Sequence, residues 1–393
     1  MFNTFSKQDN EGVIDYILRL SDMKKDNKDI TWQFIADCVH QEYGLSRSES
    51  WVRKTVKDAL GLSNNEEDLL EQIREQKQLM DETYMNIRKE KVKLSDERCQ
   101  VNAYYRALSR EDTIKEIALV TAQEMSSKKM LPTYVLKDCG DKEAILCISD
   151  WHYGIEITNP WNEFSPEICK ERVSKLLEKT IKRIKENKVK RLHLANLGDL
   201  IAGRIHLGLR LDSRFDVITQ TIGVSEILAE FISSLSKYVK VEYYDCVDNH
   251  SRLEPNKKEA QELETLSRII PWYLKERLKD NVNFFLHENE FGADLITFET
   301  MGYKVIGCHG DKDPIKNIDH LSMMTEQHYD LLLTAHAHHF ACEEKNRTVA
   351  LGNGTLMGTD SFAQRLRLSS TPSQNLIIVS NDNPTECIYR IVL

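Results

Sequence analysis

The stretch LLLTAHAHHF, residues 331–340, places three histidines directly after a run of apolar residues. An apolar run that ends in polar side chains is typical of a buried strand that reaches the edge of a sheet. His336 and His338 are two residues apart, so their imidazoles point to the same side of an extended backbone. This pattern indicates either a metal-binding pair or a polar strand end without a ligand. His339 would point to the opposite side, and we do not expect it to be a ligand.

Four other apolar runs from residue 129 onward end in the same way. Each is followed by side chains that commonly bind metals, namely Asp150 and His152, Asp199, Asn249, and His309. Any one of them alone is better explained as a cap or turn residue than as a ligand. Because all of them follow apolar runs, together they predict one shared metal site at the ends of several strands.

Short apolar runs alternate with amphipathic stretches from residue 129 onward, which predicts an α/β domain of sheets covered by helices. The two helical stretches that we expect between the early strands are residues 165–187 and 219–239. The expected strands are residues 143–149, 191–197, 239–247, 294–300, 303–309, 329–335, 375–380 and 387–393.

The order D-x-H, GD, NH, H and H-x-H resembles that of the calcineurin-like metallophosphoesterase superfamily, over about residues 143–345. Within it, the HGD at residues 309–311 and the separate N-terminal region resemble SbcD-type DNA-repair nucleases and their phage-encoded relatives. The resemblance implies a layered β-sandwich flanked by helices. Protein serine/threonine phosphatases match less well, because the chain lacks their GDxxDRG sequence after Gly198 and Asp199.

The resemblance implies two divalent metal ions, which would neutralise the phosphate ester and supply the hydroxide that attacks it. It implies that Asp199 bridges them and that Asp150, His152 and His338 complete one shell. The other shell would be Asn249, His309 and His336. Mixed nitrogen and oxygen ligands suit manganese, iron or zinc, and the nuclease branch implies manganese. Asp311 would orient His309.

His250 follows a ligand and is expected to donate a proton to the leaving oxygen, or to form only a supporting hydrogen bond. Five further cationic side chains could contact substrate phosphates or could be solvated surface charges: Arg204, His206, Arg252, Arg365 and Arg367.

Three positions depart from the family pattern. Asp248 and Ala335 stand where glycine is usual, and Ser251 where a carboxylate is frequent, so we expect altered loop geometry and an altered orientation of His250.

Residues 1–62 contain three amphipathic segments, two of them ending at Gly44 and Gly61. This spacing predicts a helix-turn-helix-like module. Cationic residues on or before the last segment, Arg47, Arg53, Lys54 and Lys57, would contact DNA. Alternatively, the module binds protein or only packs its helices together.

Residues 63–128 are polar, with almost no glycine or proline, and predict a long helical connector to a domain at 129–393. Ile73, Met80, Ile87, Leu94 and Val101 recur every seven residues, but the companion positions are mixed. The pattern indicates either a helix that lies on another surface or a weak coiled coil that makes a homo-oligomer.

The net charge of −9 argues against a protein that coats nucleic acid, so any contact with DNA must be local. The nine cysteines form no C-x-x-C pair, which fits a reducing cytoplasm. No signal peptide or membrane span is evident. We therefore predict a cytoplasmic DNA nuclease of the metallophosphoesterase type. The alternatives are a phosphodiesterase or phosphatase for a small nucleotide or phosphoprotein, and a DNA-binding scaffold with an inactive domain; whether an ATPase partner exists is open.

Overall fold

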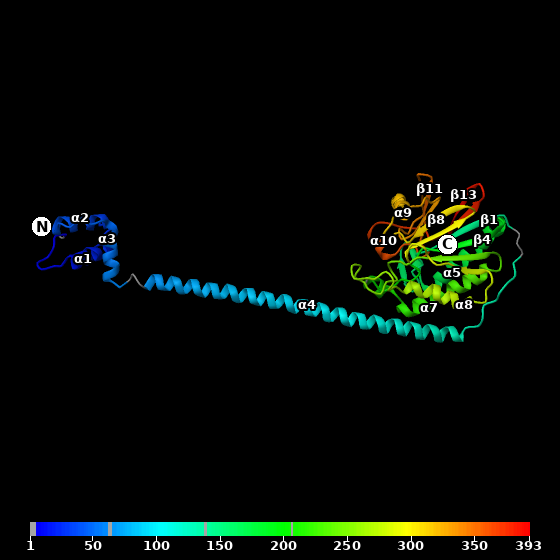
Figure 1. The fold of residues 1–393 in the computed structure, drawn as a ribbon, viewed down its shortest axis with the longest axis horizontal. Coiled ribbons are helices and arrows are strands. Elements are labelled where there is room, and N and C mark those ends of the chain that lie inside the picture. Colours follow the sequence, from blue (N-terminus) through cyan, green and yellow to red (C-terminus); the bar gives the residue numbers. More distant parts are fainter. Residues whose placement is uncertain (1–4, 62–64, 137–139, 206) are drawn as a thin grey trace. The chain divides into compact units, whose positions relative to one another are not determined.

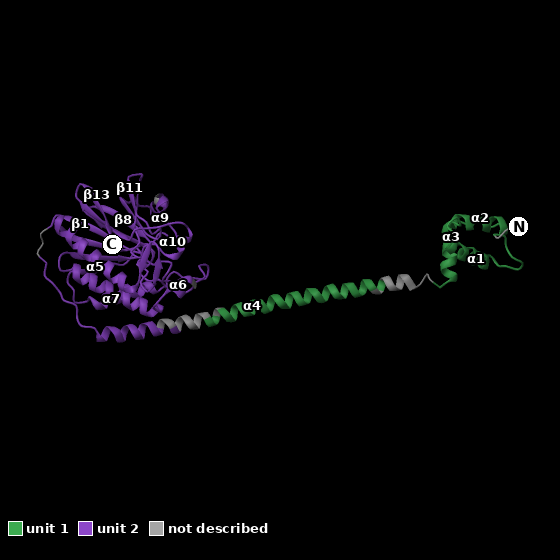
Figure 2. Ribbon diagram, turned by 180° about the vertical axis from the view of Figure 1, so that it is seen from behind, with its two compact units in different colours: residues 1–108 green, residues 109–393 purple. Residues whose placement is uncertain are grey.

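The computed structural model describes residues 5–61, 65–136, 140–205 and 207–393. The chain forms two compact units, residues 1–108 and 109–393 (Figure 2). Their division falls inside helix α4 (Asn65–Ser127), whereas the sequence places boundaries at 62 and 128. The sequence-based boundaries stay a prediction.

The first unit begins with three short helices, α1 (Val13–Asp26), α2 (Trp32–Tyr43) and α3 (Glu49–Ala59) (Figure 1). Side-chain oxygens of Thr31 and Ser48 cap α2 and α3, and Gly44 ends α2 with a left-handed φ of 68°. The helices share an apolar core that includes Tyr16, Ile35 and Val52. The all-α module is thus confirmed, while its interpretation as a DNA-binding helix-turn-helix stays a prediction.

Helix α4 covers most of the predicted connector as one helix of 63 residues. Its apolar side chains between residues 73 and 105 are exposed. Nearer its end, Ile117 is fully buried in the core of the second unit. This end of α4 is therefore part of the second unit.

The second unit contains two large sheets (Figure 1). Parallel pairing joins the central strands of the first sheet. Its strands, in spatial order, are β13 (Asn383–Val392), β12 (Ser373–Ser380), β1 (Lys142–Ile148), β4 (Val189–Asn196), β5 (Lys240–Asp245) and β6 (Phe284–Leu286).

Strands β8 and β9 of the second sheet are also parallel. This sheet has the order β10 (Ala341–Lys345), β11 (Thr348–Gly352), β9 (Leu331–Thr334), β8 (Tyr303–Cys308) and β7 (Leu295–Thr300). A separate hairpin joins β2 (Ile157–Asn159) and β3 (Asn162–Phe164). The sequence analysis did not predict β2, β3, β6, β10 or β11, which are short or lie in polar stretches.

Strand β1 shows how the layers form. Ala144 and Leu146 lie in the cluster that includes helix residues, whereas Ile145 and Cys147 lie in the cluster that joins the two sheets. Both faces of β1 are therefore buried, as the period of two in a strand requires. Leu321 of helix α9 packs against the outer side of the second sheet. The predicted sandwich flanked by helices is confirmed.

Helices α5 (Pro166–Glu186), α7 (Val217–Leu235) and α8 (Ile269–Arg277) pack against the outer face of the first sheet, and α9 (Ile318–Thr325) packs against that of the second. The unit also contains the short helices α6 (Leu207–Asp212) and α10 (Ser361–Arg365) and the 3₁₀ turns η1 (Leu266–Arg268) and η2 (Ile315–Asn317). The sequence predicted α5 and α7. Among the described residues, none of the helices combines the length and apolar character that crossing a membrane would require.

Candidate metal centre

Loops that follow five strands bring the predicted ligands together. Asp150 and His152 follow β1, Asp199 follows β4, and Asn249 follows β5. His309 and the pair His336 and His338 follow β8 and β9 of the other sheet. Because the strands within each of these two sets are parallel, their carboxyl ends reach the same edge of each sheet. Both edges contribute to one cluster.

The backbone at this cluster is strained. Five of the seven predicted ligands have a positive φ between 45° and 63°, in the left-handed region that residues other than glycine seldom adopt: Asp150, His152, Asp199, His336 and His338. Such conformations cost about 1–3 kcal/mol each and tend to gather at functional sites. The strain therefore marks the cluster as the functional region of the unit.

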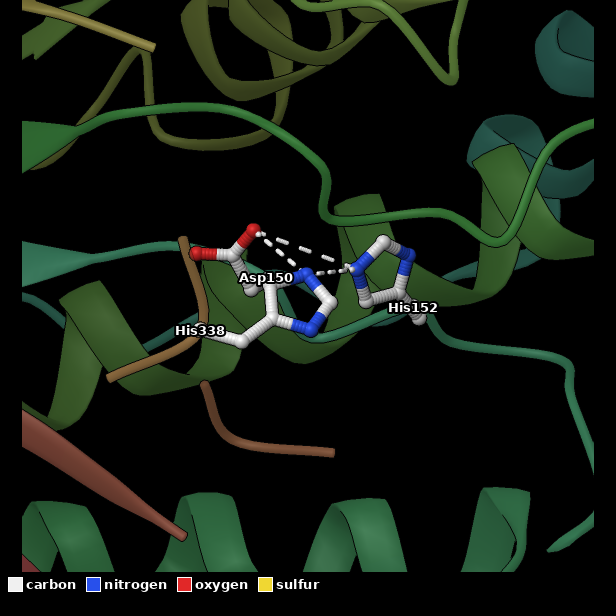
Figure 3. A group of neighbouring side chains, drawn as sticks. All are labelled: Asp150, His152 and His338. Carbon is white, nitrogen blue, oxygen red and sulfur yellow. Dashed lines mark hydrogen bonds and ion pairs between the residues drawn. The ribbon is translucent and has the colours of Figure 1, made fainter. Parts of the chain in front are cut away.

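Asp150, His152 and His338 form the first group (Figure 3). The Nε2 atom of His338 lies 3.3 Å from Asp150 Oδ1 and 3.2 Å from His152 Nε2. His152 Nε2 lies 3.9 Å from the same carboxylate oxygen. The three side chains therefore point toward one another and could hold a metal ion.

Asp199 belongs to two more groups, one with His152 and His250 and one with His309 and His336. Its Oδ2 atom lies 3.1 Å from His309 Nε2, 3.8 Å from His250 Nε2 and 4.0 Å from His152 Nε2.

Asn249 lies beside the group of Asp199, His309 and His336, with its Oδ1 atom 2.8 Å from His309 Nε2. His336 Nδ1 lies 3.1 Å from that same nitrogen. The carboxylate of Asp199 thus lies between the two sets of side chains that the sequence assigned to two metals.

The donor atoms fit a cation. Asp150 and Asp199 are fully buried, and Asp150 Oδ1 and Asp199 Oδ2 are without a hydrogen-bond partner among the described residues. A buried charged oxygen that has no donor is costly. Both atoms face imidazole nitrogens, and a divalent cation would satisfy oxygen and nitrogen together.

Burial and charge shift the pKa values of these groups in opposite directions. Burial alone would raise the pKa of Asp199, but the imidazoles of His250, His309 and His152 hold it well below its usual range. Burial would lower the pKa of His309, yet Asp199, Asp150 and Asp248 raise it to about 10. Burial and the neighbouring His250 lower the pKa of His152 to about 3. The metal-free site therefore holds a proton on His309 at neutral pH.

Metal affinity is expected to rise with pH, because a metal must displace the proton on His309. With one proton released, the apparent association constant for Mn²⁺ should increase by about tenfold per pH unit through the neutral range. Competition with a fluorescent chelator at pH 6, 7 and 8 measures this. An affinity that stays flat or falls as the pH rises would contradict protonated His309 in the metal-free form.

Two backbone carbonyls orient the imidazoles. His309 Nδ1 donates to the Leu197 carbonyl at 2.7 Å, and His250 Nδ1 donates to the Ala202 carbonyl at 2.9 Å. Each bond leaves Nε2 directed at the cluster. The expectation that Asp311 orients His309 is wrong, because the carbonyl of Leu197 takes that proton and Asp311 lies 3.3 Å from Lys257 Nζ.

The departures from the family pattern have local explanations. Asp248 accepts hydrogen bonds from the Ser251 amide at 2.7 Å and from its hydroxyl at 3.0 Å, so the two unusual residues stabilise one loop. Gly198 faces Asp248 so closely that an added Cβ would lie 2.6 Å from the Asp248 Cβ. Ala335 is not among the residues with a positive φ, so no glycine is needed there. His250 is oriented by Ala202, not by Ser251.

The predicted substrate contacts have different surroundings. Arg204 and Arg252 donate to backbone carbonyls of their own region, at Leu253 and at Glu254 and Pro255. Arg252 also lines a cavity of about 150 Å³ together with Asn249 and His309. Arg365 and Arg367 are exposed, at the end of α10 and just beyond it. His206 lies outside the described residues. His339 is exposed, with its Nδ1 bonded to the Ala337 carbonyl at 2.8 Å.

A buried polar network beneath Asp150 was missed by the sequence analysis. The Ser149 hydroxyl donates to Asp150 Oδ2 at 2.7 Å, and Asn353 donates to that hydroxyl at 2.8 Å. Gln374 accepts from the Ser149 amide at 2.9 Å, and Thr355 donates to the Asp150 carbonyl at 2.9 Å. The sequence contains only two short stretches of small or polar residues, 353–355 and 373–375, as a signal of this network. Their composition does not indicate that they lie together.

Replacing Ser149 by Ala should weaken metal binding by about 10- to 100-fold, because the carboxylate of Asp150 loses the donor that holds it. Isothermal titration with Mn²⁺ measures the change. Ser225→Ala is the matched control, since that buried serine donates only to the Thr221 carbonyl within α7. Equal affinities in the two variants would show that Ser149 does not support the site.

Comparisons with known proteins give one curated relative and several solved structures. No family model matches the chain. The SPbeta prophage-derived uncharacterized protein YonJ of Bacillus subtilis (strain 168) is 25% identical over 395 residues, covering 94% of each chain.

The structures include a novel archaeal phosphodiesterase, with 13% identity and a TM-score of 0.34 over 64% of this chain and 99% of that one. Vps29 of Entamoeba histolytica complexed with zinc has 10% identity and a TM-score of 0.31 over 63% and 96%. A predicted phosphoesterase of Streptococcus pneumoniae TIGR4 has 10% identity and a TM-score of 0.27 over 63% and 98%.

The geometry of the site can be compared with the resemblance that the sequence motifs carry. Seven ligand-type residues, in the order of the family motifs, meet at the strand ends of a two-sheet sandwich that helices flank. A buried aspartate lies between the two sets, and a further histidine faces it. This arrangement agrees with the resemblance to the calcineurin-like metallophosphoesterase superfamily that the sequence motifs carry.

Proposed function

We propose that the chain is a metal-dependent phosphodiesterase that cleaves nucleic acid, with DNA as its substrate. The single observation that carries the phosphodiesterase part is the convergence of all seven predicted ligands around the buried carboxylate of Asp199. A silent scaffold would have no need to keep two buried carboxylates that each have one oxygen without a hydrogen-bond donor among the described residues.

In this proposal two metals are held by the two sets of side chains and share Asp199. Asp150, His152 and His338 would hold one, and Asn249, His309 and His336 the other. When bound, the metals would neutralise the phosphoryl oxygens and lower the pKa of the attacking water. Manganese is the metal that we propose, with iron and zinc as alternatives, because nitrogen and oxygen donors are mixed at both positions.

His250 would protonate the leaving oxygen. Its side chain is 13% exposed, so it is reachable from solvent, and its Nε2 lies 3.8 Å from Asp199 Oδ2. Its Nδ1 proton is already given to the Ala202 carbonyl, so only Nε2 can exchange a proton with substrate. As water attacks phosphorus and the ester bond breaks, a proton from Nε2 would prevent release of a free alkoxide. Arg252 would contact a phosphate through the cavity that it lines with Asn249.

The preference for DNA rests on the N-terminal module and on the relative. Helix α3 exposes Arg53, Lys54 and Lys57, and the exposed Arg47 precedes it. Such a basic helix suits the major groove. The prophage-derived relative covers almost the whole chain, so we propose a phage-encoded protein of the SbcD-like kind. A phosphodiesterase for a small nucleotide is the second candidate, favoured by the net charge of −9.

One substrate panel tests the proposal. Metal-stripped protein with Mn²⁺ added back is incubated with duplex DNA, single-stranded DNA, a chromogenic phosphodiester and a chromogenic phosphomonoester. Cleavage of DNA and of the diester is expected. Turnover of the monoester without DNA cleavage would overturn the nuclease assignment, and turnover of the diester alone would favour the small nucleotide.

A charge reversal on α3 should separate DNA binding from chemistry. Lys54→Glu with Lys57→Glu should weaken duplex binding by at least about tenfold at low salt, because two phosphate contacts become repulsive. Turnover of the small diester should not change. Lys25→Glu with Lys28→Glu, on and just after α1, is the matched control with the same change in net charge. Equal DNA binding by both double variants, measured by fluorescence anisotropy, would refute a DNA contact through α3.

A further inference from the structure

Helix α4 carries a stripe of exposed apolar side chains that the proposed chemistry does not use. Ile73, Met80, Ile87, Leu94 and Val101 recur every seven residues, and each is between 51% and 75% exposed. Tyr84 and Tyr105 lie three residues before Ile87 and Leu108 and are also more than 60% exposed. A stripe with this spacing runs along one side of a helix over four heptads.

The spacing fits a second helix better than a flat surface. A repeat of seven residues keeps its apolar seam facing a partner only if two helices wind around each other with a left-handed supercoil. Large apolar side chains in a continuous exposed row usually mark an interface. The stripe therefore points to a helical partner with the same repeat.

Charges beside the stripe identify that partner as a second copy of the chain. The stripe fixes the heptad register, with Ile87 and Leu94 at d positions. In this register the a positions include three cations, Lys77, Lys91 and Arg98. Glu90 and Glu97 occupy the g positions directly before Lys91 and Arg98. In a parallel pair, a cationic side chain at a lies next to the preceding g residue of the other helix. Lys91 would then meet Glu90 of the second copy, and Arg98 would meet Glu97 of the second copy.

The same charges select the orientation and the number of helices. Antiparallel pairing would direct the glutamates at g toward each other instead of toward the cations. In a dimer the long stems of lysine and arginine can carry their charges out to water, whereas a trimer would bury them. Within one chain Glu90 lies 3.3 Å from Lys93, an exposed pair of small energy that does not prevent the second contact.

We propose that residues 73–105 of α4 form a parallel two-stranded coiled coil with a second copy of this chain. The full chain, of 45.6 kDa, should therefore sediment with twice that mass at micromolar concentration. Ile87→Lys with Leu94→Lys should raise the dissociation constant of the dimer by about a hundredfold or more, because lysine keeps the helix but loses the buried apolar contact. A wild-type chain that sediments as a monomer at these concentrations would overturn the proposal.

Met85→Lys with Val92→Lys is the matched control. These two apolar residues are 53% and 56% exposed, like the stripe, but follow directly after a positions and so face away from the seam. The control should remain dimeric. If both double variants dissociate equally, the stripe is not the interface and the proposal is wrong.

Two further measurements test the pairing. Glu90→Lys with Glu97→Lys should weaken the dimer at least about tenfold, and adding Lys91→Glu with Arg98→Glu should restore it. With the exposed Cys99 and Cys342 replaced by Ser, Met80→Cys alone and Val101→Cys alone should each form an oxidised dimer in high yield. Cross-linking only when the two cysteine variants are mixed would show an antiparallel pair and overturn the parallel register, as would a failure of the charge exchange to restore binding.

Discussion

Asp199→Asn is expected to lower phosphodiesterase turnover by about a thousandfold or more. Asp199 is the carboxylate that both proposed metal positions share, with its Oδ2 atom 3.1 Å from His309 Nε2 and 4.0 Å from His152 Nε2. An amide has the same shape but no charge, so neither metal would keep its bridging ligand. The loss should appear in kcat and in metal content together.

Burial opposes the charge of Asp199, but the imidazoles of His250, His309 and His152 hold its pKa well below its usual range, so the charged carboxylate stabilises the fold at neutral pH. The same substitution should therefore lower the melting temperature of the metal-free protein. Addition of Mn²⁺ should raise the melting temperature of the wild type but leave that of the variant unchanged.

Asp216→Asn is the matched control for Asp199→Asn. It changes a carboxylate to an amide at the N-cap of α7, where asparagine caps equally well, and it should keep its activity and its response to metal. An Asp199→Asn variant with wild-type turnover would show that the site has been assigned to the wrong residues.

His250→Gln is expected to lower kcat on DNA by about 100- to 10,000-fold without loss of metal, because it removes a general acid and not a ligand. The loss should be much smaller with a nitrophenyl diester, because nitrophenolate leaves without a proton. This dependence on the leaving group distinguishes proton donation from a structural role. His339→Gln, which changes an exposed histidine bonded only to the nearby Ala337 carbonyl, should behave as wild type.

A different result would change the role of His250. Reduced metal content in His250→Gln would make it a ligand, in keeping with its place beside Asp199 and His152. An equal loss on both substrates would leave its side chain as a support for the loop, through the hydrogen bond that Nδ1 donates to the Ala202 carbonyl at 2.9 Å.

The residues that the structure brings together can be picked out from the sequence because each follows an apolar run. The ends of β1, β4 and β9 can be identified from these runs, and parallel strands put such ends at the same edge. What the sequence could not predict are the contacts between segments far apart in the chain. The carbonyl of Leu197 orients His309 across 112 positions, and Gln374 supports Ser149 across 225. A backbone carbonyl has no sequence signature. Asp311 is close to His309 in sequence, and for that reason the sequence wrongly favours it as the group that orients His309.

The short strands were missed for a related reason. Strand β10 is almost entirely exposed and reads ACEEK, with no apolar alternation, yet it pairs along its length with β11. Its conformation is fixed by the neighbouring strand and not by its own residues. The left-handed backbone at Asp150 and His338 is equally hidden, because neither residue type requires it.

Counting the bound metal ions tests whether Asp199 holds a pair of them. Metal-stripped wild-type protein is loaded with Mn²⁺ and freed of excess metal, and its manganese content is measured by inductively coupled plasma mass spectrometry. The Asp199→Asn variant and the Asp216→Asn control are treated in the same way. We expect two manganese ions per chain in the wild type and the control, and fewer than one in Asp199→Asn. One ion or none in the wild type, or the same content in all three proteins, would contradict the two-metal site.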